Sequence, residues 1–165
     1  METTAIGEAL TWLEKSNADL QPELLSADAA RASLADYARA EKLASYGKTV
    51  LAQRVADATQ VARATGTSMG KAKAAVDAGA ALKDADEVRD AFLGGSISLD
   101  QVSEIVRAEG ARPGSSTELL ALADKEPFQV LRDRARKIVL PSSVGAWPSD
   151  SGKHAAPGPS QTSSA

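Results

Sequence analysis

Alanine fills 33 of the 165 positions in this chain, and no other feature constrains the fold as strongly. Alanine has the highest helix propensity of all residues. The aromatic residues that favour strands make up only 4 %, and the β-branched residues are scattered. We therefore expect an all-α domain of several helices. Because much of the apolar material is alanine, the helices must approach each other closely, and the core should be thin.

Helix start and stop signals predict two N-terminal helices of unequal length. The first should begin behind Thr3 or Thr4 and end near Asn17, with its apolar residues at a 3.6-residue period. The second should begin at Ser26, whose hydroxyl can cap it, and run to about residue 64. At 1.5 Å per residue it would be roughly 55 Å long, so it needs a partner along its length.

Five further helix starts carry signals of their own. The best specified of them pairs Ser98 with Gln101 as a capping box and places Ile97 where it can pack against Val102. The preceding helix should end at Gly94. The predicted starts are Ser68, Asp84 with Glu87, Ser98 with Gln101, Ser115 with Glu118, and Pro127 in the first turn of the last helix.

The composition changes after Pro141, where Ser, Gly, Pro and Ala dominate and no hydrophobic period remains. Such a segment buries too little apolar surface to offset the entropy of ordering. We therefore divide the chain into a helical domain, residues 1–140, and a disordered low-complexity tail, residues 141–165.

Charge is distributed unevenly around a net value of −3. Residues 1–47 carry eight acidic and four basic side chains, whereas residues 48–83 carry six basic and two acidic ones. Residues 84–109 are acidic again, and residues 128–140 have a net charge of +3. This pattern indicates two basic surfaces on an otherwise acidic body, although helical surfaces also vary in charge without functional meaning.

Several classes of chemistry are excluded by the residues themselves. The chain has no cysteine, and its one histidine, His154, lies in the predicted tail. Carboxylates such as Asp84 and Asp100 are explained by helix capping and the helix dipole, and no phosphate-binding glycine loop occurs. We expect no catalytic residue, no metal and no cofactor. Without an apolar span or a leader segment, we expect a cytoplasmic protein that does not contact membranes.

The segment Thr59–Val76 has the layout of a helix-turn-helix, with Gly66 in the turn. A recognition helix beginning at Ser68 would present lysines but no Arg, Asn or Gln, so phosphate contact is favoured over base readout. An ordinary alanine-rich helical hairpin fits the same pattern. The candidate DNA-binding residues are Arg63, Ser68, Lys71, Lys73, Lys83, Arg132, Arg134, Arg136 and Lys137.

Three runs carry a family resemblance: Thr65-Gly66-Thr67-Ser68, Gly95-Ser96-Ile97-Ser98-Leu99-Asp100-Gln101, and Leu131-Arg132-Asp133-Arg134-Ala135-Arg136. Over residues 22–140 the chain resembles the actinobacterial domain-of-unknown-function family 222, the 13E12 repeat family. This helical region is commonly found upstream of an HNH nuclease domain. An HNH site needs several histidines, so the resemblance implies a relative of the accessory region without the nuclease.

Two functions of different classes follow. The first is a non-enzymatic, DNA-associated helical module that binds weakly and mainly through phosphate. The alternative is a protein-interaction module that forms a homodimer or binds a separate HNH-containing protein.

Overall fold

The computed structural model describes residues 3–140, and within this range the chain forms helices and no strands. The predicted all-α class is therefore confirmed, while the predicted tail, residues 141–165, lies outside the described residues. The elements are α1 (Thr3–Asp19), the 3₁₀ turn η1 (Pro22–Leu24), α2 (Ala27–Val55), α3 (Ala58–Thr65), α4 (Met69–Ala81), the 3₁₀ turn η2 (Leu82–Asp84), α5 (Asp86–Leu93), α6 (Leu99–Ala111), α7 (Ser115–Lys125) and α8 (Phe128–Val139).

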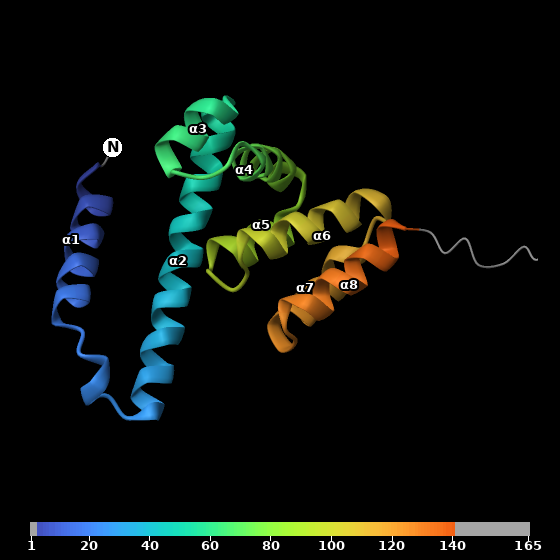
Figure 1. Ribbon diagram of the computed structural model, residues 1–165. Coiled ribbons are helices and arrows are strands. Elements are labelled where there is room, and N and C mark those ends of the chain that lie inside the picture. The colour runs from blue at the N-terminus through green and yellow to red at the C-terminus, as the bar shows by residue number, and fades with distance from the viewer. Residues whose placement is uncertain (1–2, 141–165) are drawn as a thin grey trace, which may run out of the picture.

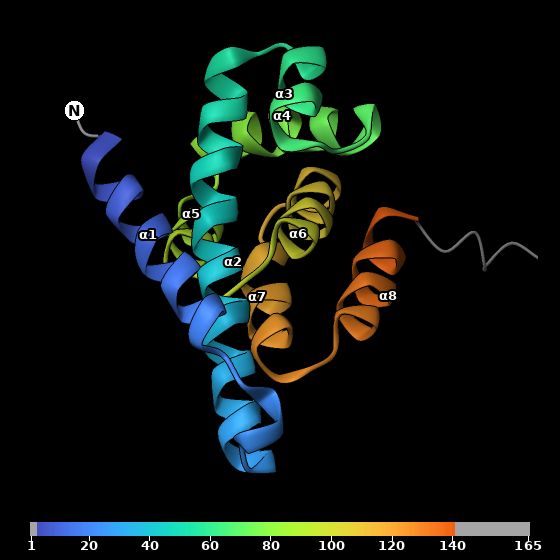
Figure 2. The same cartoon turned by 60° about the vertical axis from the view of Figure 1, so that its left-hand side comes forward.

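The long helix α2 forms one side of the molecule (Figure 1). Helices α3 and α4 pack at its C-terminal end, and α5 to α8 form a bundle beside it (Figure 2). Helix α6 is the central element, because it packs against α2, α4, α5, α7 and α8. Helix α1 runs along α2 as an antiparallel arm outside this bundle.

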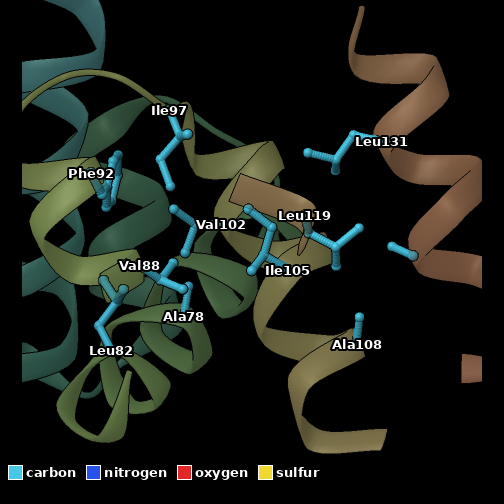
Figure 3. Close-up of a cluster of buried hydrophobic side chains, with 11 residues drawn as sticks. Ala78, Leu82, Val88, Phe92, Ile97, Val102, Ile105, Ala108, Leu119 and Leu131 are labelled. Atoms are coloured by element: carbon cyan, nitrogen blue, oxygen red, sulfur yellow. The ribbon is translucent and has the colours of Figure 1, made fainter. Parts of the chain in front are cut away.

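The main core fills the space among α4 to α8. Phe92, Val102, Ile105, Leu119 and Leu131 are fully buried in it, and they come from four different helices. Figure 3 shows Leu119 of α7 and Leu131 of α8 directed toward each other beside α6. The core therefore depends on residues far apart in the sequence.

The crossing of α2 and α4 is made of small side chains. A Cβ added to Gly79 of α4 would lie 2.6 Å from the Cβ of Gln53 and 2.8 Å from the carbonyl oxygen of Thr49, both in α2. Ala52, Val61 and Ala72 form a second, small core cluster next to this crossing. The expected close approach of alanine-rich helices is confirmed here.

Three predicted caps are confirmed. The hydroxyls of Ser26 and Ser68 accept hydrogen bonds from backbone amides in the first turns of α2 and α4. At α6 the full capping box of Ser98 and Gln101 is present.

The predicted end of the long helix is wrong. Helix α2 ends at Val55, because Ala56 adopts the left-handed conformation at φ 56°. The Asp57 carboxylate then accepts hydrogen bonds from the amides of Thr59 and Gln60 and starts α3. The new direction brings Val61 of α3 into the second cluster, so tertiary packing outweighs the uninterrupted helix propensity of this segment.

The predicted capping box of Asp84 with Glu87 is also wrong. Leu82 is buried, and it holds residues 82–84 in the 3₁₀ turn, so α5 begins only after Ala85, with no side-chain cap. Glu87 instead accepts a hydrogen bond from the hydroxyl of Thr117 in α7 at 2.9 Å.

The last two helix starts are each displaced by one residue. Helix α7 is preceded by Gly114 at φ 85°, Ser115 is its first helical residue, and the predicted box with Glu118 is absent. Pro127 is the residue before α8 rather than a member of its first turn.

The N-terminus of α7 is capped from the preceding helix. The Glu109 carboxylate accepts hydrogen bonds of 2.7 Å from the backbone amides of Gly114 and Ser116. These bonds hold the pKa of Glu109 below its ordinary value, and the bond from the Gly114 amide has the largest effect. Glu109 thus connects the end of α6 to the start of α7.

We predict that Glu109→Gln lowers the free energy of unfolding by about 0.5–1 kcal/mol near pH 7, the range for a charge at a helix N-terminus. Because the folded-state pKa is lowered, the contribution is complete above the unfolded pKa near 4.3 and is lost as the pH falls through the folded-state value. Urea unfolding at several pH values should show the two proteins converging below about pH 4. The control is Glu8→Gln, which removes the same charge from an exposed position of α1. A difference that stays constant with pH would contradict this role.

Candidate nucleic-acid interface

The α3–turn–α4 unit is built by three local features. Gly66 ends α3 in the left-handed conformation at φ 65°, where glycine has no steric cost. The hydroxyls of Thr65 and Thr67 lie 2.8 Å apart across this turn. Ser68 then caps α4 by accepting from the amide of Lys71. Two helices joined by a tight turn are therefore present where the sequence predicted them.

Helix α4 divides into a buried face and an exposed face. Ala72 is 1 % exposed and packs with Val61 of α3, and Ala75 lies beside this cluster. Lys71 and Lys73 are both exposed, but two residues apart they lie on different sides of the helix. Met69, between the cap and the lysines, is 52 % exposed. The exposed surface of α4 thus offers two cations and few hydrogen-bonding groups for reading bases.

The basic side chains of residues 48–83 are exposed and form no ion pair with an acid among residues 3–140. In the described part of the chain, ion pairs involve Arg31, Arg89, Arg107, Arg112 and Arg134. None of the basic residues between 48 and 83 belongs to this set. Their charged groups are therefore accessible to an external anion. They are Lys48, Arg54, Arg63, Lys71, Lys73 and Lys83.

Of the two acids in this segment, Asp57 is hydrogen-bonded to the first turn of its own helix. The backbone amides of Gln60 and Thr59 hold the pKa of Asp57 below its ordinary value. Its negative charge is thus paired with the positive end of the α3 dipole. The lowered pKa keeps Asp57 ionised, so this segment retains its negative charge.

A cavity of about 380 Å³ lies between α2, α3, α4 and α6. Lys42 and Lys48 of α2 line it together with Lys71 of α4, so α2 contributes cations beside the α3–turn–α4 unit. Thr49 lines it as well and is fully buried, and its hydroxyl has no hydrogen-bond partner among the described residues. Sequence reasoning did not select Lys42, Lys48 or Thr49. The available signal was Thr49, a polar residue three positions from Tyr46 and Ala52 on the inward stripe of α2.

The other predicted DNA-binding residues do not join this surface. Lys83 lies in η2, beyond the far end of α4, about 18 Å along the helix from Lys71 at 1.5 Å per residue. The four basic residues of α8 are separated from α4 by α6, which packs against both helices (Figure 2). Helix α6 also carries the acids Asp100, Glu104 and Glu109, and Asp100 lines the cavity together with Lys71.

Within α8, two of the four basic side chains have structural roles. Arg134 forms an ion pair with Glu118 of α7, which also pairs with Arg112 at 2.9 Å. Arg134 is thereby the main cause of the lowered pKa of Glu118. Arg132 lies over the ring of Phe128, with 5.8 Å between its guanidinium carbon and the ring centroid. This leaves the exposed Arg136 and Lys137, in the last turn of the helix, to meet an external anion.

Two searches of the described residues found neither a metal site nor a membrane span. No three His, Cys, Asp or Glu side chains in residues 3–140 lie close enough together to hold a metal ion. None of the helices in that range combines the length and the apolar character that crossing a bilayer requires.

Comparison with protein-family models, with curated proteins and with solved structures found no match to this chain. The resemblance to family 222 therefore stays a prediction based on the sequence.

Proposed function

We propose that the chain is a non-enzymatic DNA-associated module that binds duplex DNA through its phosphates. The observation that supports this proposal best is the set of exposed, unpaired cations on the end of α2, on α3 and on α4. Exposed lysines and arginines release condensed counterions when they meet phosphate, and this release drives binding without regard to sequence.

The N-terminus of α4 adds to this attraction. The hydroxyl of Ser68 accepts a hydrogen bond from the amide of Lys71, while the amides of Met69 and Gly70 in the same first turn donate no hydrogen bond to the described residues. Free amides and the positive end of a helix dipole favour an anion. Arg63 lies in the last turn of α3, and Lys71 and Lys73 lie in the first turns of α4. We assign about three phosphate contacts to these residues.

In this proposal the chain is a cytoplasmic relative of the helical region found upstream of HNH nucleases. It supplies DNA affinity, and the cleavage chemistry belongs to an HNH domain in a separate protein. The candidate DNA-binding residues of the first surface are Arg63, Ser68, Lys71 and Lys73.

The test measures how affinity for duplex DNA depends on salt. With about three phosphates contacted, the logarithm of affinity should fall with the logarithm of salt concentration at a slope near −2.7, roughly −0.9 per phosphate. The variant Lys71→Gln/Lys73→Gln should change this slope by about 1.8 toward zero and weaken all DNA sequences equally.

The matched control is Arg136→Gln/Lys137→Gln, which removes the same charge from α8. We expect it to leave the slope unchanged. The reverse result, with the α8 variant changing the slope and the α4 variant not, would place the interface on α8. Absence of DNA binding at about 50 mM salt, where screening is weak, would contradict the proposal itself.

A second function, protein interaction, is favoured by a separate observation. Of the 17 large hydrophobic side chains that are exposed among the described residues, twelve lie in the first 55 positions. Soluble domains seldom leave so much apolar surface on one segment unless a partner covers it.

A further inference from the structure

The cavity between α2, α3, α4 and α6 is lined mostly by groups that the proposed DNA contacts do not use. Of its lining residues, only Lys71 belongs to both sets. Its volume of about 380 Å³ falls within the range of roughly 300–1,000 Å³ that is usual for small-molecule sites. Helices α4 and α6 lie on the same side of α2 (Figure 1, Figure 2), so the cavity lies where these helices meet. It is a product of the tertiary fold, with lining residues that range from position 38 to position 103.

Thr49 gives this cavity a buried polar group without a partner. It is 0 % exposed, and its hydroxyl forms no hydrogen bond with any described residue. A buried hydroxyl without a partner destabilises a protein, so such groups are rare and call for an explanation. The other threonine hydroxyls of the lining have partners, because Thr65 donates to the carbonyl oxygen of Val61 at 2.7 Å and Thr67 therefore donates to Thr65. Thr49 thus keeps its hydrogen-bonding capacity for a group that the described chain does not supply.

Three ammonium groups line the same cavity. Lys48 and Lys71 are exposed, and neither ammonium group forms an ion pair or a hydrogen bond within residues 3–140. Lys42 is half-buried and donates a hydrogen bond of 3.0 Å to the carbonyl oxygen of Ser96. An ammonium group has three N–H donors, so Lys42 is held in place while two of its donors stay free. Together with the Thr49 hydroxyl, these groups suit the oxygens of a phosphate.

Two carboxylates restrict which phosphate can enter. Glu41 and Asp100 also line the cavity, and both are exposed and form no ion pair with another described residue. With three lysines and two acids, the lining has a net charge of +1. A carboxylate accepts hydrogen bonds and cannot donate them, so it repels a bare phosphate and suits the hydroxyl groups of an organic ligand. The lining therefore favours a phosphate ester with hydroxyl groups over the backbone of DNA.

We propose that this cavity binds a small phosphate ester that carries hydroxyl groups, such as a sugar phosphate. The three lysines neutralise the phosphate, and the Thr49 hydroxyl donates to one of its oxygens. The two carboxylates accept hydrogen bonds from the hydroxyls of the ester. The site goes beyond the proposed function and does not depend on DNA binding, although Lys71 belongs to both surfaces.

The test titrates the full chain with ribose 5-phosphate and, for comparison, with ribose. Isothermal titration calorimetry should detect binding of the phosphate ester and none of the free sugar. Lys42→Gln should weaken this binding by at least about tenfold, the usual contribution of a hydrogen bond to a charged group. The control is Lys125→Gln, which removes the same charge from an exposed position of α7 and should bind like the wild type.

Variants of Thr49 separate ligand binding from stability. Thr49→Val keeps the shape of the side chain and removes the unpartnered hydroxyl, so without ligand it should raise the melting temperature by about 2–4 °C. The same variant should bind ribose 5-phosphate about tenfold more weakly than the wild type. Thr49→Ser keeps the hydroxyl and should retain binding.

Four outcomes would overturn the proposal: no binding of ribose 5-phosphate at millimolar concentration, equal binding of ribose, equal weakening by Lys42→Gln and Lys125→Gln, or unchanged affinity in Thr49→Val. A smaller salt slope for DNA in Lys42→Gln would also contradict it, because the cavity would then belong to the DNA surface. Failure to bind DNA leaves the test unaffected, since the titration contains no nucleic acid and its variants lie outside the proposed DNA contacts.

Discussion

Phe92→Ala is expected to lower the free energy of unfolding by about 3–5 kcal/mol, the largest effect of any single truncation in this chain. Phe92 is 0 % exposed and packs edge-on against Tyr46 of α2, with ring centroids 5.6 Å apart. Removing the ring leaves a cavity where α5, α6 and α2 meet, and it also breaks the contact that ties α2 to the main core.

Chemical denaturation monitored by circular dichroism measures this loss. Leu93→Ala provides the comparison, because the neighbouring side chain is 52 % exposed and its truncation should cost about 1 kcal/mol or less. Equal losses for the two variants would show that Phe92 does not anchor the core.

Gly79→Ala is expected to destabilise the protein by about 1–3 kcal/mol, even though alanine is the better helix former by about 1 kcal/mol. The new methyl group would meet the Thr49 carbonyl oxygen at 2.8 Å and the Gln53 Cβ at 2.6 Å. Both atoms are close to the α2 backbone, so relief requires the two helices to move apart. The small cluster of Ala52, Val61 and Ala72 would then lose its packing.

Gly47→Ala in the middle of α2 should have the opposite sign. No atom lies within 4 Å of the position its Cβ would take, so the substitution gains helix propensity without a clash. We expect a stabilisation of about 0.5–1 kcal/mol. Thermal unfolding of the two variants therefore distinguishes the effect of close helix packing from that of helix propensity. If both Gly79→Ala and Gly47→Ala stabilised the protein, the tight crossing of α2 and α4 would be refuted.

Sequence patterns identified the helices well where the start signal is local. Ser26, Ser68 and Ser98 cap their helices through amides within three residues, so the signal and its effect lie in one short segment. The errors arose where the determining contact is distant. Residues 82–84 follow the burial of Leu82, and the start of α7 follows a carboxylate five to seven residues earlier.

The candidate interface was predicted in part. The cations of α3 and α4 were identified by charge and by the turn at Gly66, but their grouping with Lys48 of α2 depends on the crossing angle of two long helices. Arg134 was selected for its charge alone, and its ion pair with Glu118 brings together residues 16 positions apart. The break at Asp57 was recognisable in principle, since an acid three residues before Gln60 is a frequent cap pattern.

The location of the main core in the C-terminal half has a consequence for how the chain is synthesised. Apart from Tyr46, the residues of this core lie between positions 78 and 139, so α2 leaves the ribosome before most of its packing partners exist. At about 5–20 residues per second, α4 to α8 follow over roughly 4–14 seconds. During that interval the face of α2 that later packs against α4 is exposed to solvent. The contact between Tyr46 and Phe92 can form only after α5 has been synthesised.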